Sequence, residues 1–483
     1  MAQPYTPPCQ DSQINAQPCP EEAGRLPTPS VQTRGLAACI LASSMAFIDG
    51  SALTVALPAL KSEFAGNVMA VQWVLNGYVL ALASLTMVGG SLVDTLGRAR
   101  MLTIGCIAFA LASMACALAP GAISLIVARI AQGAAAALVT PASLALIGEL
   151  FAKSQRSRAI GIWASASALT TAGGPLLGGW LVEASGWRAV FWINLPIAAI
   201  AIALLASLPA SGVRTQRPFD VLGSILLALA LFVFAMAMSA VAPMEGGGTE
   251  HGARLSGPVI AALFVCALVL LIGFWAWQKR AAHPLLPAYV FQKRSFAGLN
   301  LATLAVYAGL SIMFFLLPFE LIERRGLTPV QSGLVFLPFT LSVGFLSRSF
   351  GGLADRIGLR PMLIGGSLLS AIGFGLFAVF YSAPIWMSFL LPMSISGLGF
   401  AVIVAPLTAG VMASVDEADE GLASGINNTA SRIAQMVGVA LAALFAASAA
   451  GYVIGMGLAA AICAFGALII VATFDPPARL QEV

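Results

Sequence analysis

A single acidic residue, Asp49, lies in the middle of an apolar run that extends from Gly35 to Leu60. At about 1.5 Å of rise per residue, about 20 apolar residues allow a helix to cross a bilayer. An isolated carboxylate inside the hydrocarbon costs roughly 3 kcal/mol or more. A chain that keeps such an acid is expected to give it a charged partner, a water-filled cavity or a proton to exchange.

The composition of the whole chain is that of a membrane protein. Of its 483 residues, 59% are hydrophobic and 9% are charged, whereas soluble domains carry about 25% charged residues. The lipid bilayer is therefore the expected partner. The net charge of +4 is small and scattered, so it predicts no nucleic-acid partner.

The residues that would carry enzyme chemistry are sparse. The seven cysteines show no framework spacing and five sit in apolar runs, so no disulfide scaffold is expected. The chain has two histidines and lacks HExxH and Walker A motifs. An enzyme or redox anchor would need intramembrane His, Cys pairs or carboxylate clusters. The sequence therefore predicts a protein that is not an enzyme and needs no metal or cofactor.

Hydrophobicity predicts fourteen membrane-spanning helices after a polar, Pro-rich N-terminal tail that is expected to be disordered. The apolar runs lie approximately at 35–60, 69–93, 101–119, 122–148, 158–183, 187–208, 219–241, 257–278, 297–322, 329–353, 361–381, 384–412, 422–449 and 452–474. With the N-terminus inside, seventeen Lys and Arg fall in inner segments and five in outer ones. This asymmetry predicts that both termini are cytoplasmic. Glu320 and Glu323, at the outer end of the ninth run, are expected to be solvated.

The two halves of the chain share a loop sequence on the same side of the membrane. The first copy is GSLVDTLGR, from Gly90 to Arg98, and the second is GGLADRIGLR, from Gly351 to Arg360. Such parallel repeats are typical of two-lobed transporters. We therefore expect an all-α integral membrane protein with a cytoplasmic tail at 1–34, a six-helix lobe at 35–208, a linker with two inserted helices at 209–296, a second six-helix lobe at 297–474 and a cytoplasmic tail at 475–483.

Seven motifs in order resemble the major facilitator superfamily and, within it, the fourteen-helix drug:proton antiporters. They are FIDGSALTVALPAL, QWVLNGY, GGSLVDTLGRAR, ARIAQG, TTAGGPLLGG, WRAVFWINLP and FDVLG. The resemblance extends from Gly35 to Phe474. Two positions depart from it, because Thr95 stands where the family usually has Arg and Thr170 where the antiporter motif usually opens with Gly.

The resemblance implies that Asp49 and Arg129 handle protons, with the proton gradient as the energy source. Asp49 is about 10 residues from the outer end of its run and Arg129 about 7 residues from the outer end of its own, so their depths differ by about 5 Å. At similar depth the two charges can offset each other's desolvation. The alternative is a static ion pair that holds two helices together.

Two groups of motif residues are expected to act in conformational change or gating. The loop motif and its repeat contribute Gly90, Asp94, Gly97, Arg98, Asp355, Arg356 and Gly358. The antiporter motif contributes Gly174, Pro175, Gly178 and Gly179. The loop charges are expected to lock one closed state, and the small residues to let two helices approach closely. The alternatives are charges that only set topology, and ordinary close packing.

The candidates for a substrate cavity are polar or aromatic residues within the runs. They are Asp49, Tyr78, Trp163, Tyr307, Asn427, Asn428 and Arg432. For Arg432, extension of the side chain toward the inner surface is the alternative. A single deep acid among aromatic faces favours lipophilic cations such as quaternary ammonium compounds or dyes.

The sequence thus predicts a monomeric, proton-coupled multidrug efflux transporter of the bacterial inner (plasma) membrane, which exports hydrophobic or cationic compounds by alternating access. An exporter of one endogenous metabolite or antibiotic is the alternative. A sensor or scaffold that does not transport is disfavoured because Asp49 is present and no added soluble domain is seen.

Overall fold

The computed structural model describes residues 28–64, 68–151, 153–208, 220–241, 256–282, 284, 286, 288–416, 420–446 and 448–475. Within these ranges the chain forms helices and no strands. Residues 1–27 of the predicted N-terminal tail lie outside the described residues, so their disorder stays a prediction, whereas Pro29 to Arg34 belong to α2 and were wrongly placed in the tail. Of the predicted C-terminal tail, Asp475 is described.

The described helices follow one another along the chain. They are α2 (Pro29–Glu63), α3 (Val68–Leu96), α4 (Arg98–Ala117), α5 (Ala122–Leu150), α6 (Lys153–Ser185), α7 (Ala189–Trp192), α8 (Asn194–Ala206), α9 (Val221–Val241), α10 (Gly257–Gln278), α11 (Ala288–Phe291), α12 (Arg294–Phe319), η1 (Glu320–Arg324), α13 (Pro329–Val335), α14 (Leu337–Leu341), η2 (Ser342–Leu346), α15 (Ser347–Ile357), α16 (Leu359–Val379), η3 (Trp386–Leu390), α17 (Leu391–Ala413), α18 (Glu420–Ala443) and α19 (Ala449–Thr473). The three η elements are single π-helical turns that continue or precede an α-helix.

Each of the fourteen predicted runs coincides with one helix or with consecutive ones. In the described part of the chain, ten helices are long and apolar enough to cross a membrane. The number rises to eleven if α13 and the helix that follows it, bent by 42°, count as one span. Helices α6, α9 and α18 occupy the other three runs, so fourteen crossings stay a prediction.

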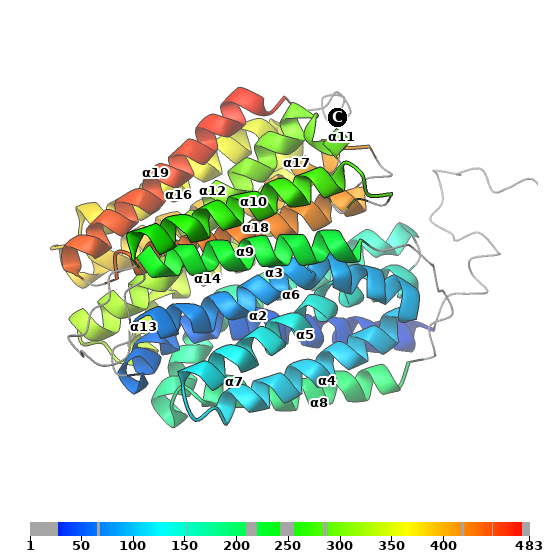
Figure 1. Cartoon of the computed structure of the whole chain (residues 1–483), viewed down its shortest axis with the longest axis horizontal. Helices are drawn as coiled ribbons and strands as arrows, with labels where there is room; N and C mark the ends of the chain where they lie inside the picture. The colour runs from blue at the N-terminus through cyan, green and yellow to red at the C-terminus, as the bar shows by residue number, and fades with distance from the viewer. Residues whose placement is uncertain are drawn as a thin grey trace, which may run out of the picture.

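The helices form two groups that lie side by side, with most contacts inside each group (Figure 1). We call α2 to α8 the N-terminal bundle and α12 to α19 the C-terminal bundle. In the first, α3 packs along α5 and α2 along α6; in the second, α16 packs along α17 and α12 along α18. The exact domain boundaries stay a prediction. The start of α2 and the end of α19 lie at the same end of the molecule, which we call the terminal end, and the opposite end is the distal end.

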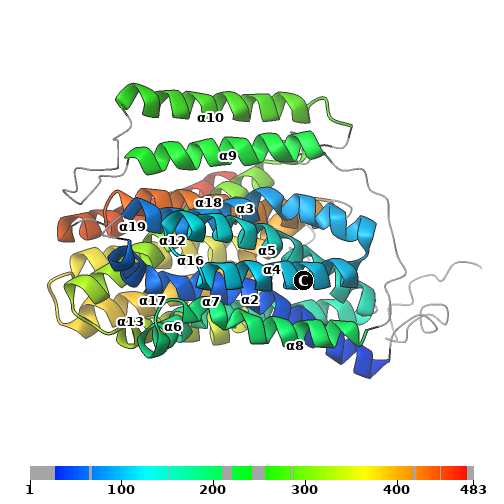
Figure 2. The same ribbon diagram turned by 60° about the horizontal axis from the view of Figure 1, so that its bottom comes forward.

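Helices α9 and α10 form a separate layer on the outside of the two bundles (Figure 2). They pack on each other, and α9 also contacts α3 of one bundle and α18 of the other. The contact is a small apolar cluster of Leu80, Leu227, Leu231, Phe274 and Met436. The inserted pair therefore touches both bundles through apolar side chains.

The FDVLG motif holds the inserted pair together at the terminal end. The carboxylate of Asp220, just before α9, accepts hydrogen bonds from Trp277 Nε1 at 2.8 Å and Gln278 Nε2 at 2.7 Å, both at the end of α10. It also accepts one from the backbone nitrogen of Gly223 at 2.8 Å, which caps the first turn of α9. One aspartate thus fixes both the start of α9 and its partner helix.

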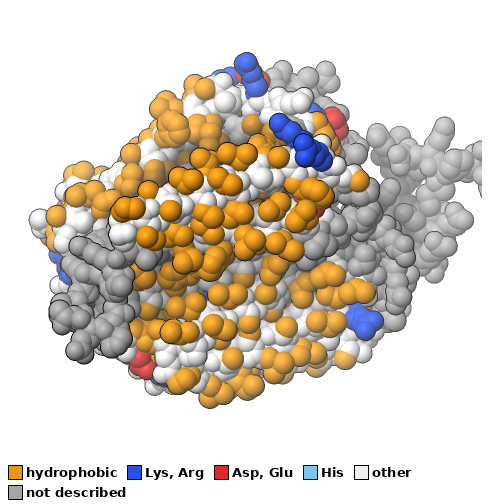
Figure 3. Space-filling model, in the orientation of Figure 1, with side chains coloured by type: hydrophobic (Ala, Val, Ile, Leu, Met, Phe, Trp, Pro, Cys, Tyr) orange, Lys and Arg blue, Asp and Glu red, His pale blue; other side chains and the backbone are white. Residues whose placement is uncertain are grey.

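The exterior of the molecule suits a lipid environment. Hydrophobic side chains cover the face seen in Figure 3, and its few Lys and Arg lie toward the periphery. Large apolar side chains such as Leu111, Val265 and Leu268 lie on the outer surface and are 57–59% exposed. A water-soluble protein rarely exposes apolar patches of this extent.

Both copies of the repeated loop contain a glycine in a conformation that L side chains rarely adopt. Gly97, between α3 and α4, has φ +99° and ψ +135°, and Gly358, between α15 and α16, has φ +88° and ψ +156°. A Cβ atom is strained in this region whatever the surrounding space. The shared glycine of the motif therefore serves the same sharp turn in both bundles.

Replacing Gly97 or Gly358 by alanine is expected to destabilise the protein by about 1–3 kcal/mol, because a non-glycine residue pays for the strained backbone. The midpoint of thermal unfolding in detergent measures the effect. Gly365→Ala, at a position on α16 with no atom within 4 Å of the added Cβ, is the matched control and should leave the midpoint unchanged or slightly raised. Equal midpoints for all three variants would contradict the prediction.

Candidate functional site

A polar cluster lies completely buried inside the N-terminal bundle. Its centre is the ion pair between the Asp49 carboxylate on α2 and Arg129 Nη1 on α5. The other carboxylate oxygen accepts hydrogen bonds from Gln132 Nε2 at 2.9 Å and from Asn194 Nδ2 at 3.1 Å. All four side chains are 0% exposed. The predicted pairing of Asp49 with Arg129 is therefore present, and two amides complete the shell around the acid.

The guanidinium of Arg129 is held on several sides. Its Nε donates to the Val74 carbonyl at 3.1 Å, and its Nη1 donates to Gln132 Oε1 at 2.7 Å as well as to Asp49. The Tyr78 ring lies 4.3 Å from its Cζ, a distance typical of a cation–π contact. Its Nη2 is buried and donates to no described residue. One face of the arginine thus keeps an unused donor.

Helix α8 anchors the cluster from the far side. Asn194 Nδ2 also contacts Ser113 Oγ at 3.0 Å, and this hydroxyl donates to the Phe191 carbonyl at 2.8 Å. The sequence analysis did not single out Gln132 or Asn194. Both lie within quoted motifs, ARIAQG and WRAVFWINLP, and Gln132 is one helical turn from Arg129 and so shares its face.

The arrangement defines the surroundings of Asp49. Its two oxygens accept hydrogen bonds from one guanidinium and two amides, and hydrogen bonds that involve charged groups are stronger than neutral ones. A movement of α2, α5 or α8 relative to the others would change this set of donors.

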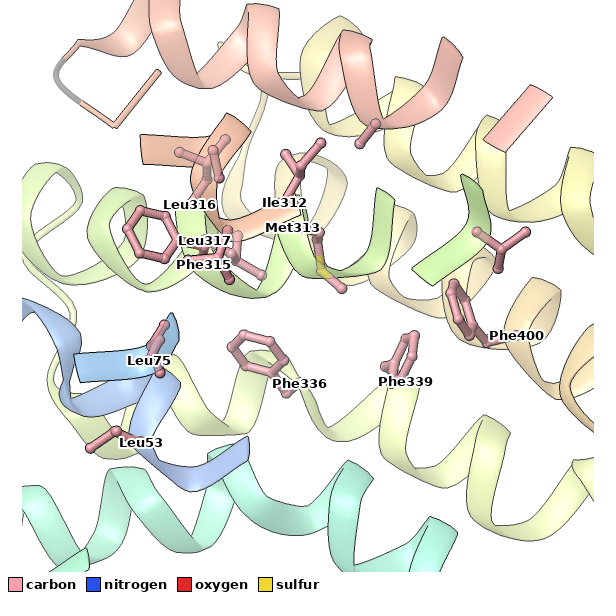
Figure 4. Packing of buried hydrophobic residues seen from close by; sticks show 14 of the residues in the cluster. Leu53, Leu75, Ile312, Met313, Phe315, Leu316, Leu317, Phe336, Phe339 and Phe400 are labelled. Atoms are coloured by element: carbon pink, nitrogen blue, oxygen red, sulfur yellow. The ribbon is translucent and has the colours of Figure 1, made fainter. Parts of the chain in front are cut away.

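A cavity lies between the two bundles. Its described lining residues are Ala46, Phe47, Gly50, Ser51 and Thr54 of α2, Leu75, Tyr78 and Val79 of α3, Arg129 of α5, Thr171 of α6, Leu310, Ser311, Phe314 and Phe315 of α12, and Arg432, Gln435 and Val439 of α18. Close by, Leu53 and Leu75 of the N-terminal bundle belong to the same buried apolar cluster as Phe315 and Phe336 of the C-terminal bundle (Figure 4). The cavity is thus built from both bundles, and Arg129 belongs both to it and to the buried cluster.

Of the cavity candidates, Tyr78 and Arg432 line the cavity. Tyr78 donates its hydroxyl to the Ala46 carbonyl at 3.0 Å. Arg432 lies with its Cζ 5.9 Å from the Phe47 ring, and its Nη1 is 3.3 Å from Gln435 Oε1. Its Nε is buried with no partner among the described residues. The side chain of Arg432 therefore lies at the cavity and not at the inner surface.

The other cavity candidates do not appear among the described lining residues. Asp49 is enclosed in its cluster. Trp163 Nε1 donates to Ser43 Oγ at 3.0 Å, and Asn427 Nδ2 donates to Thr303 Oγ1 at 2.7 Å. The Tyr307 ring packs on Phe400 at 6.3 Å, and Asn428 is half-buried on α18.

Phe47 is a cavity residue that the sequence analysis did not single out. Its ring packs edge-on against Trp163 of α6 at 6.4 Å and faces Arg432 of α18 at 5.9 Å. Phe47 opens the quoted motif FIDGSALTVALPAL, but nothing in the sequence shows which way its side chain points. Only the packing of three helices reveals its position.

The glycines of the antiporter motif are sites of close backbone contact. A Cβ atom at Gly174 or Gly178 of α6 would overlap Ser51 or Ala52 of α2. A Cβ atom at Gly179 would overlap the Pro329 carbonyl at the start of α13 in the other bundle. At Gly333 of α13, a Cβ atom would lie 2.7 Å from the Pro175 carbonyl. We call this contact between α6 and α13 the distal seam.

Charged groups join the bundles beside the distal seam. Lys61 of α2 forms an ion pair with Glu323 at 2.9 Å, and the Glu183 carboxylate accepts a hydrogen bond from the Val330 backbone nitrogen at 3.0 Å. The prediction that Glu320 is solvated was wrong. This side chain is 0% exposed because Arg324 and Arg325 contact it at 2.9 and 3.1 Å, where η1 turns it inward.

The loop motif is described in part. Arg98 forms an ion pair with Glu149 of α5 at 3.6 Å, and Arg356 is exposed. The side chains of Asp94 and Asp355 lie outside the described residues. The close contact in the first copy falls on Gly89, where a Cβ atom would overlap the Ala137 carbonyl, whereas Gly90 has only an ordinary contact at 3.9 Å.

Two apolar helical bundles that enclose a cavity between them are the architecture of a secondary transporter. The sequence model of the Major Facilitator Superfamily matches residues 39–291 and 299–482 of this chain. The chain belongs to this superfamily. It is therefore a multi-pass membrane transporter of small molecules and not an enzyme.

Curated relatives include exporters and resistance proteins. The chain is 34% identical over 400 residues to the multidrug resistance protein Stp of Mycobacterium tuberculosis (strain CDC 1551 / Oshkosh), covering 82% of this chain and 72% of the relative. It is 30% identical over 440 residues to the tetracenomycin C resistance and export protein of Streptomyces glaucescens, covering 89% and 80%. The chain is thus related to drug efflux and antibiotic resistance exporters.

Solved structures show the same fold at low sequence identity. A peptide transporter POT in complex with sulfate superposes with a TM-score of 0.70 at 14% identity, covering 94% of this chain and 97% of that one. The xylose transporter XylE from E. coli, in a partially occluded inward open conformation, superposes with a TM-score of 0.62 at 15% identity, covering 92% and 100%.

Replacing Asp49 by asparagine is expected to destabilise the protein by about 3–5 kcal/mol, because Arg129 then remains as a buried charge without a counter-ion. The double variant Asp49→Asn/Arg129→Gln removes both charges and is expected to recover part of this loss. The thermal unfolding midpoint in detergent measures both. A double variant no more stable than Asp49→Asn would show that the two charges do not depend on each other.

Replacing Gly179 by alanine is expected to hold the distal seam open, because its Cβ atom overlaps Pro329 when the bundles close. Spin labels at Ser62→Cys and Ser382→Cys, two exposed distal positions, report the separation by pulsed electron resonance after Cys9, Cys19 and Cys266 are replaced by serine. The distance distribution should shift to longer values in Gly179→Ala. Gly173→Ala, with no atom within 4 Å of its Cβ, is the control. An unchanged distribution in Gly179→Ala would refute the steric argument.

Proposed function

We propose that this protein is a proton-coupled efflux transporter of a bacterial plasma membrane, with both termini cytoplasmic, which exports hydrophobic small molecules as a monomer by alternating access. Its relation to multidrug and antibiotic resistance exporters supports export as the direction of transport. A cavity lined by apolar and aromatic side chains of both bundles supports hydrophobic substrates.

The observation that carries the proposal is the double position of Arg129. This residue pairs with the fully buried Asp49 and also lines the cavity. A substrate that engages Arg129 and a proton that binds Asp49 both act on the same ion pair. One residue shared by the cavity and the buried cluster therefore couples the two sites reciprocally.

Helix α2 connects Asp49 to the distal seam between the bundles. Asp49 lies two residues before Ser51 and three before Ala52, on which Gly174 and Gly178 of α6 pack. Opening of the distal seam moves α6 and therefore acts on the turn of α2 that follows Asp49. The close packing of these glycines is thus the means by which they act in gating.

An exporter of a single antibiotic or endogenous metabolite is the second candidate. The relative named for tetracenomycin C favours it, because that name gives one compound. The fold and the buried cluster serve both candidates equally. They differ only in how many compounds the cavity accepts.

The test is compound-driven proton movement in proteoliposomes that carry an imposed pH gradient and an internal pH indicator. Ethidium (cationic), N-phenyl-1-naphthylamine (neutral) and 8-anilinonaphthalene-1-sulfonate (anionic) are added separately. At least one is expected to dissipate the gradient with the intact protein and to lose this effect in Asp49→Asn, which cannot exchange a proton.

The matched control is Asp416→Asn, at a side chain that is 73% exposed and should not affect the rate. Undiminished movement in Asp49→Asn would place the proton site elsewhere. No movement with any of the three compounds in the intact protein would contradict proton coupling for hydrophobic substrates.

A further inference from the structure

The charges that face the cavity are of one sign. Among its described lining residues, Arg129 and Arg432 are charged and none is acidic. The nearby acid, Asp49, is 0% exposed, and its two oxygens already accept from Arg129, Gln132 and Asn194. Arg129 is thus neutralised by its partner, and the positive charge of Arg432 is left over.

Arg432 has few partners of its own. None of the described ion pairs includes it, its contact with Gln435 Oε1 is 3.3 Å long, and its buried Nε has no acceptor. An arginine enclosed in a membrane protein normally pairs with an acid or with carbonyl groups. The second unused donor at the cavity, Arg129 Nη2, is likewise on an arginine. The cavity therefore presents hydrogen-bond donors of two arginines that have no acceptor, and a negatively charged group is the acceptor that suits them best.

The remaining lining residues suit the apolar body of a ligand. Phe47, Phe314 and Phe315 supply aromatic faces, and the hydroxyls of Ser51, Thr54 and Ser311 already donate to carbonyls of their own helices. These hydroxyls therefore add few donors to the cavity. A flat hydrophobic body with one acidic group would contact the rings and place its acid at Arg432.

We propose that the cavity selects hydrophobic compounds that carry an anionic group such as a carboxylate, sulfonate or phenolate, and that Arg432 is the residue that binds this group. The proposal names the substrate class of the transporter proposed above and rests on that function for its role in export. It reverses the expectation of cationic substrates, which treated Asp49 as a free charge in the cavity. A lipophilic cation would instead meet the positive charge of Arg432 without an accessible acid.

The test compares two compounds with the same ring system. 8-Anilinonaphthalene-1-sulfonate and N-phenyl-1-naphthylamine differ by one sulfonate, and ethidium provides the opposite charge. Their binding to the purified full chain in detergent is measured by equilibrium dialysis against protein-free micelles. The sulfonate is expected to bind at least about tenfold more tightly than the neutral compound, as expected for a charge-assisted hydrogen bond to arginine.

In Arg432→Gln this preference should disappear while the neutral compound binds within about twofold of its original affinity, which also shows that the cavity is intact. Arg432→Lys should retain part of the preference because it keeps the charge without the planar fork of donors. Arg280→Gln, at an exposed position just after α10, should change nothing. Equal binding of the two compounds to the intact chain, an unchanged preference in Arg432→Gln, or tighter binding of ethidium than of both would overturn the proposal.

The binding assay and the transport assay distinguish a failure of the Arg432 assignment from a failure of the proposed export function. Selective binding of the sulfonate without proton movement in proteoliposomes would sustain the assignment of Arg432 and contradict the proposed export. Proton movement driven by ethidium alone would sustain the export and overturn the assignment.

Discussion

Burial of one carboxylate inside a bundle of apolar helices is the constraint on which this structure depends. Asp49 is kept inside the N-terminal bundle because α5 supplies Arg129 and Gln132 and α8 supplies Asn194. Breaking such a pair leaves an uncompensated buried charge, which costs far more than the pair itself contributes. The relative depth of three helices is therefore fixed by electrostatics, while apolar packing only fills the space around them.

The sequence predicted the structure correctly where a single residue type determines it, as apolar, charged or glycine residues do. Apolar runs place every long helix, and the depths of Asp49 and Arg129 correctly place them together. Gly97 and Gly358, found as a repeat, both occupy the turn that only glycine tolerates easily. The sequence did not predict the structure where the surroundings of a side chain are formed by other elements of the fold. Phe47 opens a quoted motif, but the sequence does not show that its ring faces Arg432 of another helix. Glu320 looked solvated because nothing in its local sequence shows that η1 turns it toward the interior.

The cavity illustrates the same limit in the candidate site. Asp49 and Arg432 were both correctly selected as intramembrane charges, but their exposure to the cavity depends on which side chains reach them first. Gln132 and Asn194 cover the acid, whereas the contacts of Arg432 leave its Nε unpaired. The expectation built on the single deep acid therefore gave the opposite sign to the charge that faces the cavity. Charge compensation is a three-dimensional property, and a short motif records only one half of each pair.

The inserted pair α9 and α10 has a mechanical consequence. Its contact at Asp220 consists of directional hydrogen bonds within the pair. Its described contacts with α3 and α18 include the small apolar cluster and the Trp73 and Phe232 rings, 5.8 Å apart. Dispersion contacts lack the directionality of hydrogen bonds. In the transport cycle proposed above, the pair can therefore stay assembled while the two bundles rotate against each other.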